Sequence, residues 1–135
     1  MTETSPRHPE LAAGRWSQLS LAEQLANVGS EVGRMVRWRE RDPRLMMAGF
    51  DRALELLDLT LADPRWRDRL REIARVRELL CDTTLGACEY STTLEDLVRY
   101  LLAFAVAARN ARQAGRAGQD SAVARSAPIT ESGER

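Results

Sequence analysis

Each of the three tryptophans in the chain directly follows an arginine, in the pairs Arg15-Trp16, Arg37-Trp38 and Arg65-Trp66. An arginine beside an exposed aromatic ring can bind a phosphate while the ring stacks on a base, which is the chemistry of single-stranded nucleic-acid contact. The alternative is structural, because on a buried helix face a flanking guanidinium group covers the edge of the ring by a cation–π contact. Trp66 lies on an apolar stripe and Trp38 lies near a predicted helix end, so both interpretations stay open.

Arginines gather near Trp38 and along residues 64–83, whereas residues 43–62 are acidic. This segregation gives the hypothesis of one continuous basic surface for nucleic acid, made of Arg37, Trp38, Arg41, Arg67, Arg71 and Arg75. In the alternative, these arginines pair with the acids of the neighbouring helix, Asp51, Glu55 and Asp58, and the basic field is cancelled. All twenty basic residues are arginine. The formal net charge is zero, and this balance of charge is not typical of a bulk nucleic-acid binder.

Catalytic chemistry has few candidates in this sequence. His8 is the only histidine and lies in a segment without apolar periodicity, so neither a Ser-His-Asp nor a Cys-His arrangement is expected. No GxxxxGK(S/T) or GxGxxG pattern is present to bind a phosphate. We therefore predict no catalytic residue, no metal ligand and no cofactor. The rival hypothesis is an enzyme with a carboxylate-only metal site at Glu55 and Asp58, although exposed acids on a helix surface are the simpler interpretation.

The cysteines and the chain start indicate a cytoplasmic protein. Cys81 and Cys88 are spaced as CDTTLGAC, which is not a CxxC redox or zinc pattern, and both are expected to be reduced thiols. No run of about 20 apolar residues is present, so no membrane span and no membrane partner are predicted. The opening MTETSPRHPE lacks the apolar core of a signal peptide.

Apolar periodicity predicts an all-α protein with four helices, at about 20–41, 43–62, 64–83 and 92–112. The connections at Asp42-Pro43 and Asp63-Pro64 are short, which favours antiparallel neighbours packed up-down-up-down as a four-helix bundle. Each aspartate suits an N-cap and each proline suits the first helical position. Capping boxes are expected at two other helix starts, between Ser20 and Glu23 and between Thr92 and Glu95.

The bundle is predicted to occupy residues 16–113, with disordered tails at 1–15 and 114–135, where apolar periodicity is lost. The predicted core consists of the apolar stripes of the four helices, Leu25, Val28, Val32, Phe50, Leu54, Leu57, Leu61, Leu70, Ile73, Leu80, Leu97, Leu101 and Phe104.

Two features indicate close helix contacts and self-association. Small residues form a ridge on the first helix, and a second apolar row runs along the fourth, so the candidate contacts are Ala22, Ala26, Gly29, Gly33, Val98, Leu102 and Ala105. A mid-helix glycine costs about 1 kcal/mol relative to alanine, so close approach of another backbone is the expected reason for the glycines. The partner helix is in the same chain or in a second copy. A helix that is apolar on two sides is central or faces another subunit.

Three segments, LSLAEQLANVGSEVGRMVRWRE, AGFDRALELLDLTLADPRWRDRLREIARVRELL and STTLEDLVRYLLAFAVAARNAR, resemble a family of short uncharacterised prokaryotic all-helical proteins. The resemblance covers about residues 16–112 and implies no activity. In architecture alone, the predicted bundle is similar to the ribosomal-RNA intervening-sequence bundles and to the accessory bundles of retroelement reverse transcriptases, which oligomerise and hold RNA on basic surfaces. The leading expectation is a non-enzymatic interaction protein that self-associates or binds a partner protein, and the alternative is an RNA-binding accessory bundle.

Overall fold

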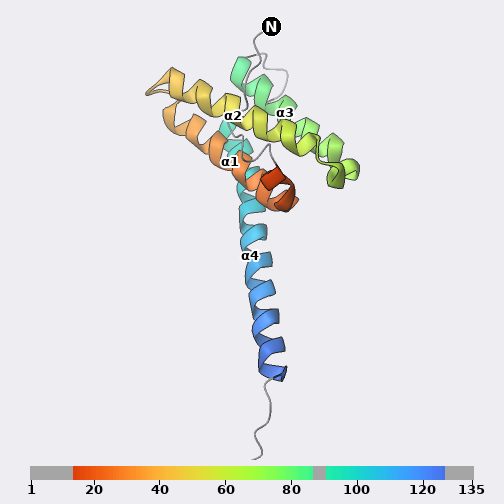
Figure 1. Cartoon of the computed structure of the whole chain (residues 1–135). Coiled ribbons are helices and arrows are strands. Elements are labelled where there is room, and N and C mark those ends of the chain that lie inside the picture. The colour runs from red at the N-terminus through yellow and green to blue at the C-terminus, as the bar shows by residue number, and fades with distance from the viewer. Residues whose placement is uncertain (1–13, 87–90, 127–135) are drawn as a thin grey trace, which may run out of the picture.

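The computed structural model describes residues 14–86 and 91–126, with side chains to Ser121. Within these ranges the chain is helical and contains no strand, which confirms the predicted all-α class with four α-helices. The elements in order are η2 (Trp16–Gln18), α1 (Leu21–Trp38), α2 (Pro43–Leu61), η3 (Pro64–Arg69), α3 (Leu70–Leu85) and α4 (Leu94–Ser126), drawn in Figure 1. His8, Cys88, most of the predicted N-terminal tail and the last nine residues lie outside the described residues.

The first two helices begin as predicted, because side chains satisfy the free amides of their first turns. The Glu23 amide donates to Ser20 Oγ at 3.1 Å, and the Ser20 amide donates to Glu23 Oε1 at 3.2 Å, which completes a capping box. At the start of α2, the carboxylate of Asp42 accepts from the amides of Arg44 and Leu45. Pro43 takes the first helical position, where no amide donor is needed.

The third helix begins later than predicted. Asp63 accepts from the Arg65 amide at 3.1 Å, as an N-cap should, but the turn that follows is the 3-10 helix η3, and α3 starts only at Leu70. Trp66 departs from helical geometry, with φ −105° and ψ 27°. Its indole N–H donates to Gln24 Oε1 in α1 at 2.9 Å. Local sequence patterns cannot predict this contact. The helix ends at Gly86, whose φ of 75° is a left-handed conformation that favours glycine.

The fourth helix differs from the prediction at both ends. Its cap pairs Thr93 with Asp96 rather than Thr92 with Glu95, since the Asp96 amide donates to Thr93 Oγ1 and the Thr93 amide donates to Asp96 Oδ2. Glu95 instead pairs with Arg39 at the end of α1. The helix continues to Ser126, well beyond the predicted end at residue 112. Alanine, arginine and glutamine are strong helix formers, and they dominate residues 109–119, so loss of the apolar pattern did not end the helix.

Most of the predicted core is buried. The buried members are Leu25, Val28, Val32, Phe50, Leu57, Ile73, Leu80, Leu97 and Leu101. Leu54, Leu61 and Phe104 are half-buried and pack against this cluster. Leu70 was wrongly assigned, since it is 39% exposed at the point where η3 passes into α3. The 3-10 turn shifts the helical phase, so the buried stripe of α3 starts with Ile73 and continues through Val76.

The centre of the molecule is α1, which packs between α2 and α4. A side chain added at Gly49 of α2 would meet Met35 of α1 at 3.1 Å, and one added at Gly29 of α1 would meet Leu101 of α4 at 2.9 Å. These two glycines therefore mark the closest approaches of α1 to its neighbours.

Ion pairs at both ends of α1 fix the direction of α4. Arg39 pairs with Glu95 at the start of α4, and Arg112 lies 3.8 Å from Glu23 at the start of α1, so the two helices run antiparallel. Figure 1 shows that α4 crosses the α1–α2 pair and then projects away from the other helices. A regular up-down-up-down packing is therefore not confirmed, although the four helices and their all-α class are.

Candidate interaction surfaces

The small-residue ridge of α1 packs against α4 of the same chain over part of its length. Gly29 is buried against Leu101, so this glycine serves an intramolecular contact. Val98 is half-buried and packs on the core. Gly33 and Ala22 are half-buried, and a side chain added at Gly33 would meet nothing within 4 Å. Some residues of the predicted ridge therefore pack within the chain, and others lie at the surface.

A groove remains open between α1 and α4 where the two helices separate. It has a volume of about 260 Å³, and its lining includes three predicted self-association residues, Ala26, Leu102 and Ala105. Polar and charged side chains complete the rim, Glu23, Asn27, Ser30, Arg109 and Arg112. We call this surface the α1–α4 groove. Small side chains on its floor make it shallow and accessible to a helix side chain from outside.

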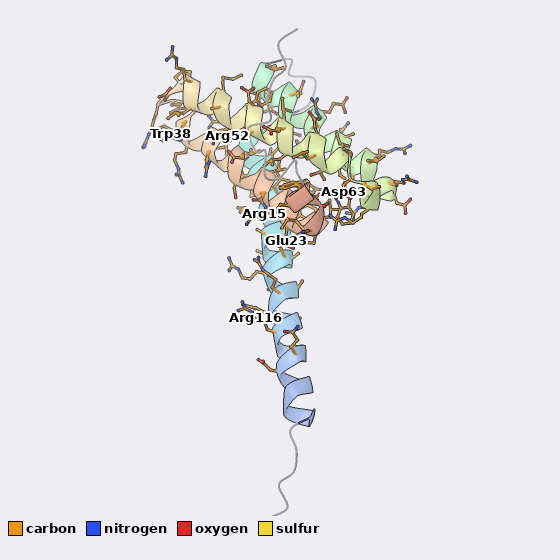
Figure 2. All side chains as sticks on the ribbon, viewed as in Figure 1. Arg15, Glu23, Trp38, Arg52, Asp63 and Arg116 are labelled. Atoms are coloured by element: carbon orange, nitrogen blue, oxygen red, sulfur yellow. The ribbon has the colours of Figure 1, made fainter. Side chains whose placement is uncertain are left out.

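Two large apolar side chains of α4 are exposed, one of them at this groove. Leu102 is 52% exposed and lines the groove, and Val106, one helical turn further along, is 55% exposed. Val106 was not among the predicted contacts, although its spacing of four from Leu102 on a helix was a usable signal. Beyond it, each residue from 109 to 121 is exposed. Figure 2 shows Arg116 on this projecting part of α4.

The predicted basic surface has members at both ends of α2. Trp38 and Arg41 precede α2, and Arg67 and Arg71 follow it. The 19 residues of α2 place its ends about 28 Å apart. In Figure 2, Trp38 and Asp63 mark these opposite ends. Trp38 and Arg41 therefore lie at the opposite end of α2 from Arg67, whereas α3 runs back along α2 from Leu70.

The acids of α2 neutralise only part of the basic helix. Asp58 accepts from Arg77 Nε at 2.9 Å, which is the kind of α2–α3 pairing that the alternative interpretation expected, although with a different arginine. Among the described residues, Arg67 and Arg71 are exposed and make no ion pair. Asp58 is therefore paired with α3, and Arg67 and Arg71 are left available.

A polar cluster at the start of α1 was not predicted from sequence. Gln24 is fully buried, and its Nε2 donates to the Trp16 carbonyl at 2.9 Å and to Asp63 Oδ2 at 3.1 Å. Its Oε1 accepts from Trp66 Nε1, while Trp16 Nε1 donates to Thr60 Oγ1 at 3.2 Å. Gln24 thus ties η2, α1 and the turn after α2 together, and two of the three tryptophans are structural.

Arg65 closes this cluster from the outside. Its guanidinium donates to both oxygens of Asp63 and, through NH2, to the Leu19 carbonyl at 2.7 Å. The same group lies 4.4 Å from the centre of the Trp66 ring, so the cation–π interpretation of this Arg-Trp pair is confirmed. The pKa of Asp63 is lowered to about 2. The largest cause is the side-chain hydrogen bond from Arg65; burial opposes it, and hydrogen bonds from the Arg65 amide and from Gln24 add to the lowering. Asp63 is therefore ionised under ordinary conditions.

The described residues contain no group of three or more His, Cys, Asp or Glu side chains that could hold a metal ion. Asp58, one of the two proposed carboxylate ligands, is engaged by Arg77. Cys81 is half-buried and free. None of the helices in the described ranges combines the length and apolar character needed to span a bilayer.

Comparisons of the chain with family models, with curated proteins and with solved structures found no match. The family resemblance and the architectural similarity therefore stay predictions.

Proposed function

We propose that this protein is a helical interaction module that self-associates through the α1–α4 groove and the projecting part of α4. The observation that carries the proposal is the pair Leu102 and Val106, both more than half exposed, beside a groove with a floor of small side chains. A surface that carries both exposed apolar side chains and a groove can be self-complementary, with the side chains of each copy in the groove of the other. The two-fold contact common in homodimers requires this property.

The area of the surface supports a second copy as the occupant. A stable interface buries about 800 Å² on each partner, which is more than the exposed parts of Leu102 and Val106 can supply. The 33 residues of α4 extend about 50 Å. Its exposed residues 109–121 add further surface to that of the groove.

The arrangement also accounts for the isolated helix. Helices rely mainly on tertiary packing of one face for their stability in water, whereas residues 109–121 are all exposed, although Arg109 and Arg112 line the α1–α4 groove. Gly115 and Gly118 lower their helix propensity further. A second copy against this part of α4 would supply the missing contacts.

The test is sedimentation velocity at about 10 to 100 µM, comparing wild type with a Leu102→Glu/Val106→Glu variant. Wild type is expected to form a dimer or larger assembly, and the variant is expected to sediment as a monomer, because each buried carboxylate would be strongly unfavourable at the contact. Met47→Glu is the matched control, since Met47 is a large apolar residue that is 40% exposed on α2, away from the groove. A monomeric wild type, or equal assembly by both variants, contradicts the proposal.

A second candidate function is RNA contact by the arginines at the start of α3. It is supported by the exposure of Arg67 and Arg71, which make no ion pair among the described residues. Binding of a mixed RNA pool is measured by fluorescence anisotropy at 50 and 200 mM salt, with the Arg67→Ala/Arg71→Ala variant beside wild type. Two phosphate contacts to single strands should weaken wild-type binding about sevenfold over this range. Absence of binding at 50 mM, or equal binding by the variant, rejects this function.

A further inference from the structure

A second groove lies on the seam between α1 and α2 and shares no lining residue with the α1–α4 groove. Its volume is about 260 Å³, and its lining combines two arginines, an aromatic ring, a leucine and a glycine: Arg34, Trp38, Leu45, Gly49 and Arg52. Figure 2 shows Trp38 and Arg52 on these two neighbouring helices. We call this surface the α1–α2 groove. Neither the polar cluster around Gln24 nor the proposed dimer contact uses it.

Both arginines of the groove converge on one buried carboxylate. Arg34 NH1 lies 3.4 Å from Glu31 Oε1, and Arg52 NH1 lies 3.6 Å from Glu31 Oε2. The Glu31 side chain is only 9% exposed, and among the described residues its Oε2 accepts no hydrogen bond. These separations are longer than the usual 2.7–2.9 Å of a charge-assisted hydrogen bond. The two guanidinium groups therefore lie beside Glu31 without being locked onto it.

Each guanidinium group retains donors for another acceptor. The contacts with Glu31 use NH1 of each arginine, whereas a guanidinium group carries five N–H donors on three nitrogens. The Arg34 and Arg52 side chains are 53% and 28% exposed, so solvent and solutes reach them. Two positive groups and one negative group leave a formal charge of +1 at the groove, which matches a singly charged anion.

We propose that the α1–α2 groove binds a carboxylate that is attached to an apolar body. Guanidinium donors of Arg34 and Arg52 match the plane and spacing of carboxylate oxygens. Trp38 is half-buried and Leu45 is 41% exposed, and together they form an apolar wall for the body of the ligand. A phosphate monoester carries more charge than the groove balances and gains nothing from that wall. The carboxylate belongs to a small organic acid or to the C-terminus of a peptide.

Binding is measured on the full chain by nuclear magnetic resonance of the tryptophan indole N–H groups during titration with phenylacetate. The Trp16 and Trp66 indoles are bonded inside the polar cluster, so the Trp38 signal, assigned with a Trp38→Phe variant, reports on the groove. We expect a saturable shift of the Trp38 signal while the Trp16 signal stays in place. Phenylacetamide has the same body without the charge and is expected to bind about tenfold or more weakly.

Two substitutions should act in opposite directions. Arg52→Gln removes a charged donor and is expected to weaken phenylacetate binding about tenfold. Glu31→Gln removes the competing negative charge and is expected to strengthen binding severalfold, which also keeps the proposal testable if Arg52→Gln fails to fold. Arg44→Gln is the matched control, because Arg44 is an exposed arginine near the start of α2 that does not line the groove. Circular dichroism verifies the fold of each variant.

Three results would overturn the carboxylate site: absence of saturation by phenylacetate, equal binding of phenylacetamide, or equal binding of inorganic phosphate. Weaker binding by Glu31→Gln than by wild type would also contradict it. A short peptide ending in leucine, compared with its amidated form, distinguishes the two sources of the carboxylate. Tighter binding of the free peptide than of phenylacetate supports a chain terminus, and tighter binding of phenylacetate supports a small organic acid.

Discussion

At the scale of single residues, Gln24 is the side chain that connects most parts of the structure. Its amide group has two donor N–H bonds and one carbonyl oxygen, and the donors and the oxygen all find protein partners in a site without solvent. A fully satisfied buried polar group fixes one arrangement of its neighbours, because any shift leaves a donor or acceptor unpaired. The hydrogen bond from Trp66 to Gln24 holds the indole against α1 at the residue where the chain leaves helical geometry before α3.

The low pKa of Asp63 gives the chain a defined acid sensitivity. The native pKa of about 2 lies below the usual 3.8, so the folded state favours the ionised form and binds fewer protons than the unfolded state. The stabilisation is fully present above about pH 4 and is lost as the pH falls toward 2. It amounts to about 2 kcal/mol. Urea unfolding from pH 7 down to pH 2 is expected to show this loss in wild type.

An Asp63→Asn variant isolates this residue from the other carboxylates. Asparagine is also a good N-cap, so the helix start is retained while the titrating group is removed. The difference in free energy of unfolding between wild type and variant should be largest at pH 5 to 7 and should shrink as the pH falls toward 2. A difference that is constant over this pH range would show that Asp63 does not have a lowered pKa.

At the scale of elements, the two mid-helix glycines of α1 lie in different surroundings, one in a close helix contact and one in open space. Gly29→Ala would place a methyl group 2.9 Å from Leu101 Cβ, so α1 and α4 must move apart, and a loss of about 1–3 kcal/mol of stability is expected. Gly33→Ala meets nothing within 4 Å. It should raise stability by up to about 1 kcal/mol, because alanine is the better helix former. Thermal and urea unfolding of the two variants should therefore shift in opposite directions, and a stabilising Gly29→Ala would contradict the close contact of α1 with α4.

At the scale of the whole molecule, α4 has two parts with different roles. Its first turns bury Leu94, Leu97 and Leu101 in the core, and its later part is exposed from residue 109 to residue 121. The part of a helix that projects beyond the core presents exposed surface that another chain can contact. The fold therefore depends on the first turns of α4, whereas the proposed assembly uses Leu102, Val106 and the projecting part of the helix.

A chain that ends at Gln113 tests this division. Few buried contacts are removed, so its unfolding temperature is expected to stay within about 5 °C of wild type at equal, low concentration. Self-association should become at least tenfold weaker, since the contact loses the surface of residues 114–126. Sedimentation equilibrium of both chains gives the two dissociation constants. Undiminished association would show that the groove alone carries the contact.

The sequence by itself determined the helices and most of the core. Heptad-like spacing and short capping signals are local, so the starts at Ser20 and Asp42-Pro43 and the burial of Val28, Leu57 and Leu101 could be predicted. The end of α4 could not be predicted from periodicity, because an exposed helix of alanine and arginine needs no apolar stripe.

The candidate surfaces depended on the tertiary structure. The sequence named Ala26, Leu102 and Ala105, but only the packing of α1 on α4 decided that Gly29 is used inside the chain while Leu102 stays exposed. The late start of α3 accompanies a hydrogen bond between residues 42 positions apart, Gln24 and Trp66. Such contacts depend on how helices meet in space, and periodicity records only which face of each helix is apolar. The convergence of Arg34 and Arg52 on Glu31 also depends on how two helices meet. Arg34 and Glu31 lie on α1 and Arg52 lies on α2, so neither segment of sequence predicts the cluster alone.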